Sequence, residues 1–311
     1  MRGRKGGIFT GGLTLRISSK HIMQEHAVHT STAAVDREKL EALYEKYNRR
    51  EYVHPDPLEF LYDYPDPLDR EIVGLVASSL AYGGVKQILK SVRTVLDRMP
   101  SPAKFLRDSS RDELSRTFGS FKHRFTTGEE LASMLYGAGR VIERYGSLEK
   151  CVVEGFIDGD ETILPGLCRL VDEISKEAGR DFPHLLPHPC RMSACKRLNL
   201  YMRWMVRRDD IDPGGWYTVE PIRLIIPVDV HMFRICRALG ITERRQANLR
   251  TAVEITDFFR RVSPGDPVKY DFALTRLGIR DELDASAFID ECLASSGGAV
   301  LEPGITADCS G

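Results

Sequence analysis

The stretch MSACKRLNLYMRWMVRR, residues 192–208, predicts a basic amphipathic helix. Four residues recur at helical spacing and predict one buried stripe: Cys195, Leu198, Met202 and Met205. The neighbouring face is polar and mostly basic: Lys196, Asn199, Arg203 and Arg207. Basic residues outnumber the nearby acids, so this face could neutralise phosphates. A solvated helix face is the alternative, because most charge runs are only that.

A second stretch, LIIPVDVHMFRICRALG at residues 224–240, predicts another helix, which begins after Asp229 and ends at Gly240. Asp229 stands where an aspartate caps the first turn by accepting hydrogen bonds from backbone N–H groups. Most aspartates in this position do nothing else. A carboxylate fixed in this way is also rigidly oriented, so it could stabilise a positive charge or move a proton beside a bound substrate.

Lys196 and Asp229 together have the chemistry needed to open a sugar at C1′ through a Schiff base. A lysine attacks only as the free amine, which cationic neighbours such as Arg197 and Arg203, with partial burial, favour. The sequence supplies these neighbours. The alternative is that Lys196 contacts a phosphate or simply lies on the surface, as most lysines on basic helices do.

The remaining sequence is also punctuated as helices. One helix is expected to begin at Asp66-Pro67 and to end at Gly83-Gly84, and another to begin at Asp266-Pro267 and to end at Gly278. Further helices are expected over residues 36–48, 85–99, 129–146, 164–179 and 252–262. Neither strand hairpins nor an alternation of strands and helices is evident. The sequence therefore predicts an all-α protein.

The composition is that of an ordinary globular protein. The chain has 311 residues, a formal net charge of −1 and seven cysteines. The cysteines are scattered without CxxC pairs, which favours reduced thiols and a cytoplasmic location. No apolar run approaches the length of a membrane span. We expect a disordered basic arm over residues 1–34, a helical domain over 35–293 and a flexible tail over 294–311.

Two stretches resemble the helix-hairpin-helix DNA glycosylases, the superfamily that contains endonuclease III. IPVDVHMFRICRALGI (226–241) is similar to the segment that supplies the catalytic aspartate in that superfamily, and SLAYGGVKQI (79–88) is similar to an early helix–turn element that faces DNA. The separation of Lys196 from Asp229 resembles that in the archaeal 8-oxoguanine DNA glycosylases. Two features of the superfamily are missing: PCRMSACK (189–196) lacks the hairpin glycines, and the four-cysteine iron–sulfur loop is absent.

A closer resemblance is to a bacterial family known as domain of unknown function 2400. It rests on CKRLNLYMRWMVR (195–207), IIPVDVHMFR (225–234) and DPVKYDFALTRLGI (266–279). It covers most of the expected helical domain, and its motifs are specific.

The glycosylase resemblance implies a two-lobed helix-hairpin-helix fold with a cleft between the lobes. It implies a DNA base-excision repair glycosylase with AP-lyase activity on an oxidised base, in which Lys196 attacks C1′ of a flipped nucleotide and Asp229 assists. The expected partner is double-stranded DNA with a damaged base. The enzyme is expected to be a cytoplasmic, nucleoid-associated monomer that needs no cofactor and no metal. The alternatives are a non-catalytic nucleic-acid-binding module of the same fold and an enzyme acting on RNA or a free nucleoside.

The glycosylase interpretation also assigns the expected DNA contacts. Residues expected to hold nucleic acid are Arg197, Arg203, Arg207, Lys86 and Gln87. Residues expected to stack on the base or to wedge into the duplex are Trp204, Trp216 and Tyr82.

Overall fold

The computed structural model describes residues 35–191, 193–279 and 285–296. Within these ranges the chain is helical apart from loops and one two-stranded ladder, which confirms the predicted all-α class. The arm expected over 1–34 lies outside the described residues, as does most of the tail expected over 294–311. The last described helix continues to Ser296, past the boundary expected at 293. Among the described residues, no helix is both long and apolar enough to cross a lipid bilayer.

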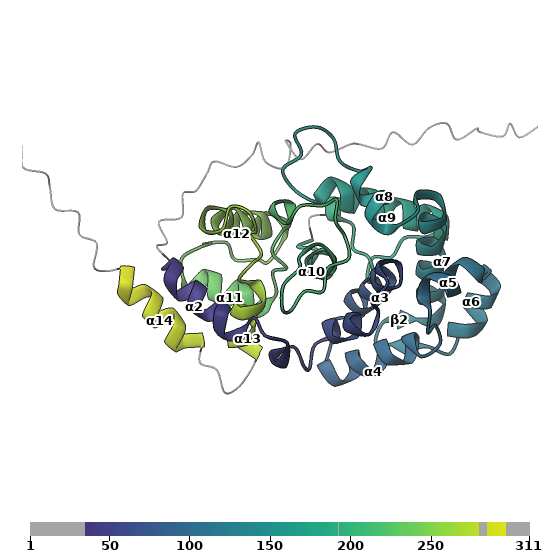
Figure 1. Cartoon of the computed structure of the whole chain (residues 1–311), viewed down its shortest axis with the longest axis horizontal. Coiled ribbons are helices and arrows are strands. Elements are labelled where there is room, and N and C mark those ends of the chain that lie inside the picture. Colours follow the sequence, from purple (N-terminus) through teal and green to yellow (C-terminus); the bar gives the residue numbers. More distant parts are fainter. Residues whose placement is uncertain (1–34, 192, 280–284, 297–311) are drawn as a thin grey trace, which may run out of the picture.

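The helices between residues 67 and 178 pack against one another on one side of Figure 1. They are α3 (Pro67–Ser79), α4 (Val85–Leu96), α5 (Pro102–Asp108), α6 (Arg111–Phe118), α7 (Gly128–Tyr145), α8 (Leu148–Val153) and α9 (Leu164–Ala178). Their ends follow the expected local signals. Asp66 caps α3 by accepting hydrogen bonds from the N–H groups of Leu68 and Asp69, and Gly146 ends α7 in the left-handed conformation.

The opposite side of Figure 1 combines the first described helix with the last ones. It holds α2 (Arg37–Tyr47), α11 (Val230–Ala238), α12 (Leu249–Val262), α13 (Asp271–Ile279) and α14 (Ala285–Ser296). Helix α13 packs on both α2 and α11. The Lys269 ammonium lies 2.6 Å from the Glu41 carboxylate, and the Tyr270 hydroxyl donates to the same carboxylate at 2.8 Å. These contacts join the two ends of the described chain.

Helix α10 (Lys196–Val206) lies between these two groups of helices and packs on α3 (Figure 1). Its side chains are buried around nearly its whole circumference, including Tyr201 and Trp204. Gly74 of α3 makes the close approach possible, because a Cβ at this position would lie 3.0 Å from the Tyr201 ring. The predicted apolar stripe of α10 is confirmed, but the remaining faces of the helix are buried as well.

Short elements connect the helices, and one of them differs from the sequence reading. The 3-10 helices are η1 (Arg50–Tyr52), η2 (Pro57–Asp63), η3 (Pro189–Arg191) and η4 (Pro221–Arg223). Strands β1 (Lys122–His123) and β2 (Thr126–Thr127) form a small antiparallel hairpin. The expectation of no hairpin was wrong, since strands of two residues show no alternation. Tyr82 holds this hairpin by donating to the His123 carbonyl oxygen at 2.8 Å.

Helix α13 begins later than expected. Asp266-Pro267 predicted its start, whereas the helix begins at Asp271. The Asp266 carboxylate instead accepts a hydrogen bond from the Val268 N–H group at 3.2 Å and pairs with Arg207 at 2.8 Å. An aspartate that bonds to the backbone two residues ahead stabilises a turn, and the long-range ion pair holds that turn in place.

Glu71 of α3 is a buried carboxylate that organises the chain around it. It accepts hydrogen bonds from the N–H groups of Leu148 and Glu149, at the first turn of α8, and from the Trp216 indole at 3.0 Å. Burial raises the pKa of Glu71 from its ordinary value of 4.5 to about 7, against the opposing effect of these donors. The folded protein therefore holds a proton here that the unfolded chain has released at mildly acidic pH.

This shift predicts a pH dependence of stability that Glu71→Gln removes. Because the folded pKa is raised, the contribution of Glu71 is fully present below pH 4.5 and is lost as the pH rises through about 7. Between about pH 5 and about pH 8, the free energy of unfolding should fall by roughly 2–3 kcal/mol more in the wild type than in Glu71→Gln. Urea denaturation at several pH values measures this difference. Parallel pH profiles for the two proteins would contradict the prediction.

Candidate active site

Lys196 is the first residue of α10. The helix was expected from residue 192 but begins at Lys196, because Cys195 adopts a left-handed conformation with φ of 46°. A non-glycine residue in this region makes the backbone turn sharply before the helix. The Lys196 side chain is 38% exposed, which distinguishes it from the buried side chains that follow it on α10. The amine is therefore held by a rigid element and remains accessible.

Asp229 lies directly opposite this amine. It is the N-cap of α11, and its Oδ1 atom accepts a hydrogen bond from the Met232 N–H group at 2.8 Å. Its Oδ2 atom lies 3.4 Å from the Lys196 Nζ atom, and the Asp229 side chain is only 11% exposed. One carboxylate oxygen thus fixes the helix start and the other faces the amine. The prediction that the fold brings these two groups together is confirmed.

Behind this pair lies a fully buried charge network. Arg203 of α10 binds Asp271 and also Asp212, the latter at 3.2 Å. Burial raises the pKa of Asp271, Arg203 opposes this effect and the nearby Asp229 adds to it. Asp229 is therefore close enough to influence the buried carboxylate. The Lys196–Asp229 pair forms the accessible end of a longer arrangement of charges.

The structure corrects the expected role of Arg203 and Arg207 as phosphate contacts. Both guanidinium groups are buried, at 3% and 4% exposure. Arg207 pairs with Asp212 at 2.5 Å, with Asp266 at 2.8 Å and with Asp209 at 2.8 Å. Donors that already satisfy buried carboxylates cannot turn outward to a phosphate without leaving those charges unpaired. The two arginines stabilise the interior instead.

The tryptophans expected to stack on a base are also interior residues. Trp204 and Trp216 are only 1% and 3% exposed. The Trp216 ring makes an edge-to-face contact with Tyr201, and its indole N–H donates to Glu71. Neither ring can reach a nucleotide, so both assignments are corrected to the hydrophobic core.

Arg197 and Tyr82 are half-buried and contact each other. The Arg197 guanidinium lies 4.9 Å from the centre of the Tyr82 ring and donates to the carbonyl oxygens of Ser79 and His184. The Tyr82 hydroxyl bonds to the β1–β2 hairpin, including Thr126 at 2.8 Å. In this arrangement Arg197 joins the end of α3 to the chain before α10, which corrects its assignment as a phosphate contact.

Lys86 and Gln87 occupy the first turn of α4, immediately after the Tyr82 turn, and both are exposed. The Gln87 amide donates to the Ser91 hydroxyl at 3.1 Å. Their assignment as nucleic-acid contacts stays a prediction.

The sequence predicted no site residue at the tip of the β1–β2 hairpin. Arg124 there has a left-handed backbone with φ of 51°, and the Phe125 side chain is 66% exposed. The Phe125 ring lies 6.0 Å from the His184 ring, and the His184 carbonyl oxygen accepts from Arg197. The tip is therefore joined to the start of α10. A non-glycine residue in a tight turn is difficult to recognise from sequence, so no local signal marked it.

The comparisons with known proteins place the chain in one family. Neither the curated proteins nor the solved structures include one that matches this chain. The family model described as "Protein of unknown function (DUF2400)" matches residues 56–280. The match spans α3 to α13, including the Lys196–Asp229 pair and every member of the buried charge network. The chain therefore belongs to the DUF2400 family.

Proposed function

We propose that this protein is a DNA base-excision glycosylase with AP-lyase activity, acting on an oxidised base through a Schiff base formed by Lys196. The observation that carries the proposal is the 3.4 Å separation between the Lys196 amine and the Asp229 carboxylate, together with the greater exposure of the lysine. A lysine nucleophile needs an adjacent group that accepts its proton, and a rigidly held carboxylate is suited to that role.

The reaction follows from these two groups. The free amine of Lys196 attacks C1′ of an extruded nucleotide, and the bond between C1′ and the base breaks, so that the base leaves with the electron pair and takes up a proton. The amine proton passes to Asp229, whose charge also stabilises the positive sugar. Asp229 then returns this proton to O4′ as the C1′–O4′ bond breaks, which leaves the opened sugar as the protonated imine. Loss of a C2′ proton to water expels the 3′ phosphate and cleaves the strand, and hydrolysis of the imine releases Lys196.

We place the substrate between the two groups of helices that flank α10. In this proposal α3–α9 form one lobe of a helix-hairpin-helix glycosylase-like fold, and α2 with α11–α14 form the other. Lys196 and Asp229, at the starts of α10 and α11, would then face DNA from the boundary between the lobes. The protein would act as a monomer at the nucleoid.

The proposed DNA contacts are exposed groups near the start of α10. Lys86 and Gln87 on α4 would hold the backbone, because they follow the turn that Arg197 contacts. Phe125 would enter the duplex beside the extruded nucleotide, since apolar side chains that wedge between base steps stabilise such distortions. Arg124, exposed next to it, would contact the adjacent phosphate.

Borohydride trapping tests this function. Borohydride reduces an imine to a stable amine, so a covalent adduct should form with a duplex that contains an oxidised base or an abasic site and not with the undamaged duplex. Peptide mapping should place the adduct on Lys196. Binding to lesion-containing DNA without an adduct on either the oxidised-base duplex or the abasic duplex would instead support a non-catalytic module. Adducts formed only with RNA or nucleosides would move the activity to those substrates.

A further inference from the structure

Three sulfur and nitrogen ligands converge at a place separate from the Lys196–Asp229 pair. Cys168 of α9, His188 and Cys190 of η3 each offer one ligand atom, and these three atoms all lie within 4.8 Å of one another. The two Sγ atoms are 3.6 Å apart. All three side chains are half-buried, so a metal ion could reach them from solvent.

The imidazole of His188 is oriented as a metal-binding histidine usually is. Its Nε2 atom lies 3.1 Å from the Asp172 carboxylate, and its Nδ1 atom accepts a hydrogen bond from the Cys190 backbone N–H at 3.1 Å. Because the carboxylate accepts and the N–H donates, Nε2 carries the proton and Nδ1 carries the lone pair. A carboxylate bound to the outer nitrogen of a ligating histidine fixes its tautomer and increases its basicity.

The separation of the sulfur atoms fits one shared metal ion. In a tetrahedral zinc site with Zn–S bonds of about 2.3 Å, two thiolates lie roughly 3.8 Å apart. The observed 3.6 Å needs little adjustment. Thiolate and imidazole ligands together favour Zn²⁺ over Mg²⁺, Ca²⁺ or Mn²⁺, which prefer oxygen.

We propose that Cys168, His188 and Cys190 bind one Zn²⁺ ion, with Asp172 supporting His188. The metal would take Nδ1 of His188 in place of the Cys190 N–H, and both thiols would lose their protons on binding. No metal was expected from the sequence, and this proposal replaces that expectation. The set does not stand out in the sequence, because Cys168 lies on a different element from the other two ligands.

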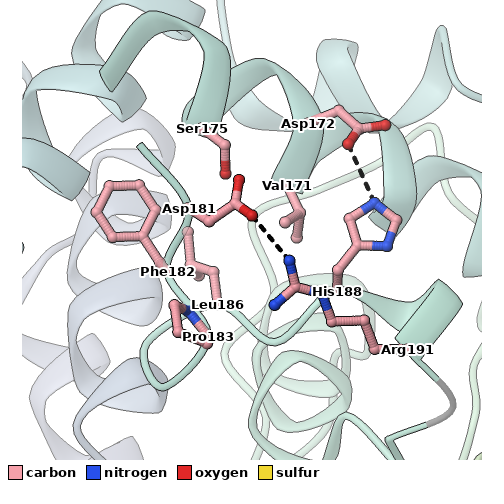
Figure 2. A pocket seen from close by; sticks show the side chains of 9 residues that line it. All are labelled: Val171, Asp172, Ser175, Asp181, Phe182, Pro183, Leu186, His188 and Arg191. Carbon is pink, nitrogen blue, oxygen red and sulfur yellow. Dashed lines mark hydrogen bonds and ion pairs between the residues drawn. The ribbon is translucent and has the colours of Figure 1, made fainter. Parts of the chain in front are cut away.

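Water would occupy the fourth position. Beside the three ligands, His188 and Asp172 line a cavity of about 120 Å³, and its lining also includes Arg191 and Asp181, which form an ion pair of 2.8 Å (Figure 2). A polar cavity of this size holds ordered water. The thiol of Cys195 points elsewhere, to the Pro187 carbonyl oxygen at 3.3 Å. Three protein ligands with one open position describe a site that can also accept a small anion.

The metal would cross-link α9 to the segment that leads into α10. His188 and Cys190 stand a few residues before Cys195, the turn from which Lys196 begins its helix. The inference does not depend on the proposed glycosylase activity, since it rests on a different set of residues. Its consequence is a more firmly held start of α10.

Metal content and cobalt spectroscopy of the full chain test the site. Protein expressed with added zinc and purified without chelators should contain one zinc ion per chain by elemental analysis. Replacement of zinc by Co²⁺ should give the intense near-ultraviolet charge-transfer band of thiolate–cobalt bonds. Cys168→Ala, Cys190→Ala and His188→Ala should each lose most of the bound zinc. If a variant does not fold, the cobalt spectrum of the wild type still tests the site, because the thiolate–cobalt band is measured without any substitution.

Cys151→Ala is the matched control, because Cys151 is a buried free cysteine on α8 outside this ligand set. It should keep the zinc and the cobalt band. A folded wild type without zinc, a cobalt spectrum without the thiolate band, or zinc retained by all three ligand variants would overturn the site. A disulfide between Cys168 and Cys190, found by peptide mapping of the unreduced protein, would also overturn the site. The two sulfur atoms would then lie close together because they form a covalent bond and not because they share a metal ion.

Discussion

Lys196→Ala is expected to lose borohydride trapping and lesion-dependent strand cleavage to background level while still binding lesion-containing DNA. The Lys196 amine supplies the nitrogen of the imine, and alanine has no group that can take its place. The side chain is partly exposed and pairs with Asp229, so its removal should affect folding little. Trapping assays measure formation of the covalent adduct, and DNA-binding titrations measure the affinity for lesion-containing DNA that the variant should keep.

Asp229→Asn separates the two chemical steps. Asparagine caps a helix as well as aspartate does, so the bond to the Met232 N–H should persist and α11 should keep its start. The negative charge beside the amine is lost. Release of the damaged base should therefore slow by about 10²–10⁴-fold, while trapping on DNA that already carries an abasic site should be reduced less.

Two controls make the comparison specific. Lys196→Arg keeps a positive charge opposite Asp229 but cannot form the imine, so it should fail in trapping as completely as Lys196→Ala. Lys104→Ala removes an exposed lysine on α5, outside the proposed DNA contacts, and should keep trapping on abasic DNA. Thermal melting of each variant checks that the fold is intact. Full trapping by folded Lys196→Ala would show that Lys196 is not the nucleophile, and unchanged base release by Asp229→Asn would leave Asp229 as a helix cap only.

The position of Asp229 could be predicted because a local signal sets it. Asp229 precedes an apolar-periodic run, and a short polar side chain there caps the helix that follows. Most helix ends were set in the same way, as Asp66 and Gly146 illustrate. The start of α10 after Cys195 could not be predicted. Cys195 is in the left-handed conformation, and a non-glycine residue in that conformation has no recognisable sequence pattern.

The environment of Arg203 and Arg207 could not be predicted for a different reason. Their charges appeared uncompensated on the helix, because two of their partners, Asp266 and Asp271, lie about sixty residues later in the chain. Only the tertiary fold brings α13 and the turn before it against α10. A helix at the centre of a molecule buries its polar face as well as its apolar stripe, and helical periodicity alone does not distinguish this case from a surface helix.

Arg203→Ala is expected to lower the free energy of unfolding by about 3–5 kcal/mol, because it leaves Asp212 and Asp271 as buried charges without their shared partner. Urea denaturation should show a lower midpoint with a similar slope. Arg208→Ala is the matched control. It removes the same charge from the neighbouring surface, where the guanidinium lies over the exposed Tyr217 ring, and should cost less than about 1 kcal/mol.

The partner variant tests whether the effect comes from an unpaired buried charge. If it does, Arg203→Ala combined with Asp271→Asn should be less destabilised than the sum of the two single variants, because the double variant no longer buries the Asp271 charge alone. Additive losses would indicate that Arg203 acts mainly through packing against Phe272, whose ring centre lies 5.7 Å from its guanidinium. An Arg203→Ala protein as stable as Arg208→Ala, with a weaker salt dependence of DNA binding, would contradict the buried network and return Arg203 to the phosphate-contacting surface.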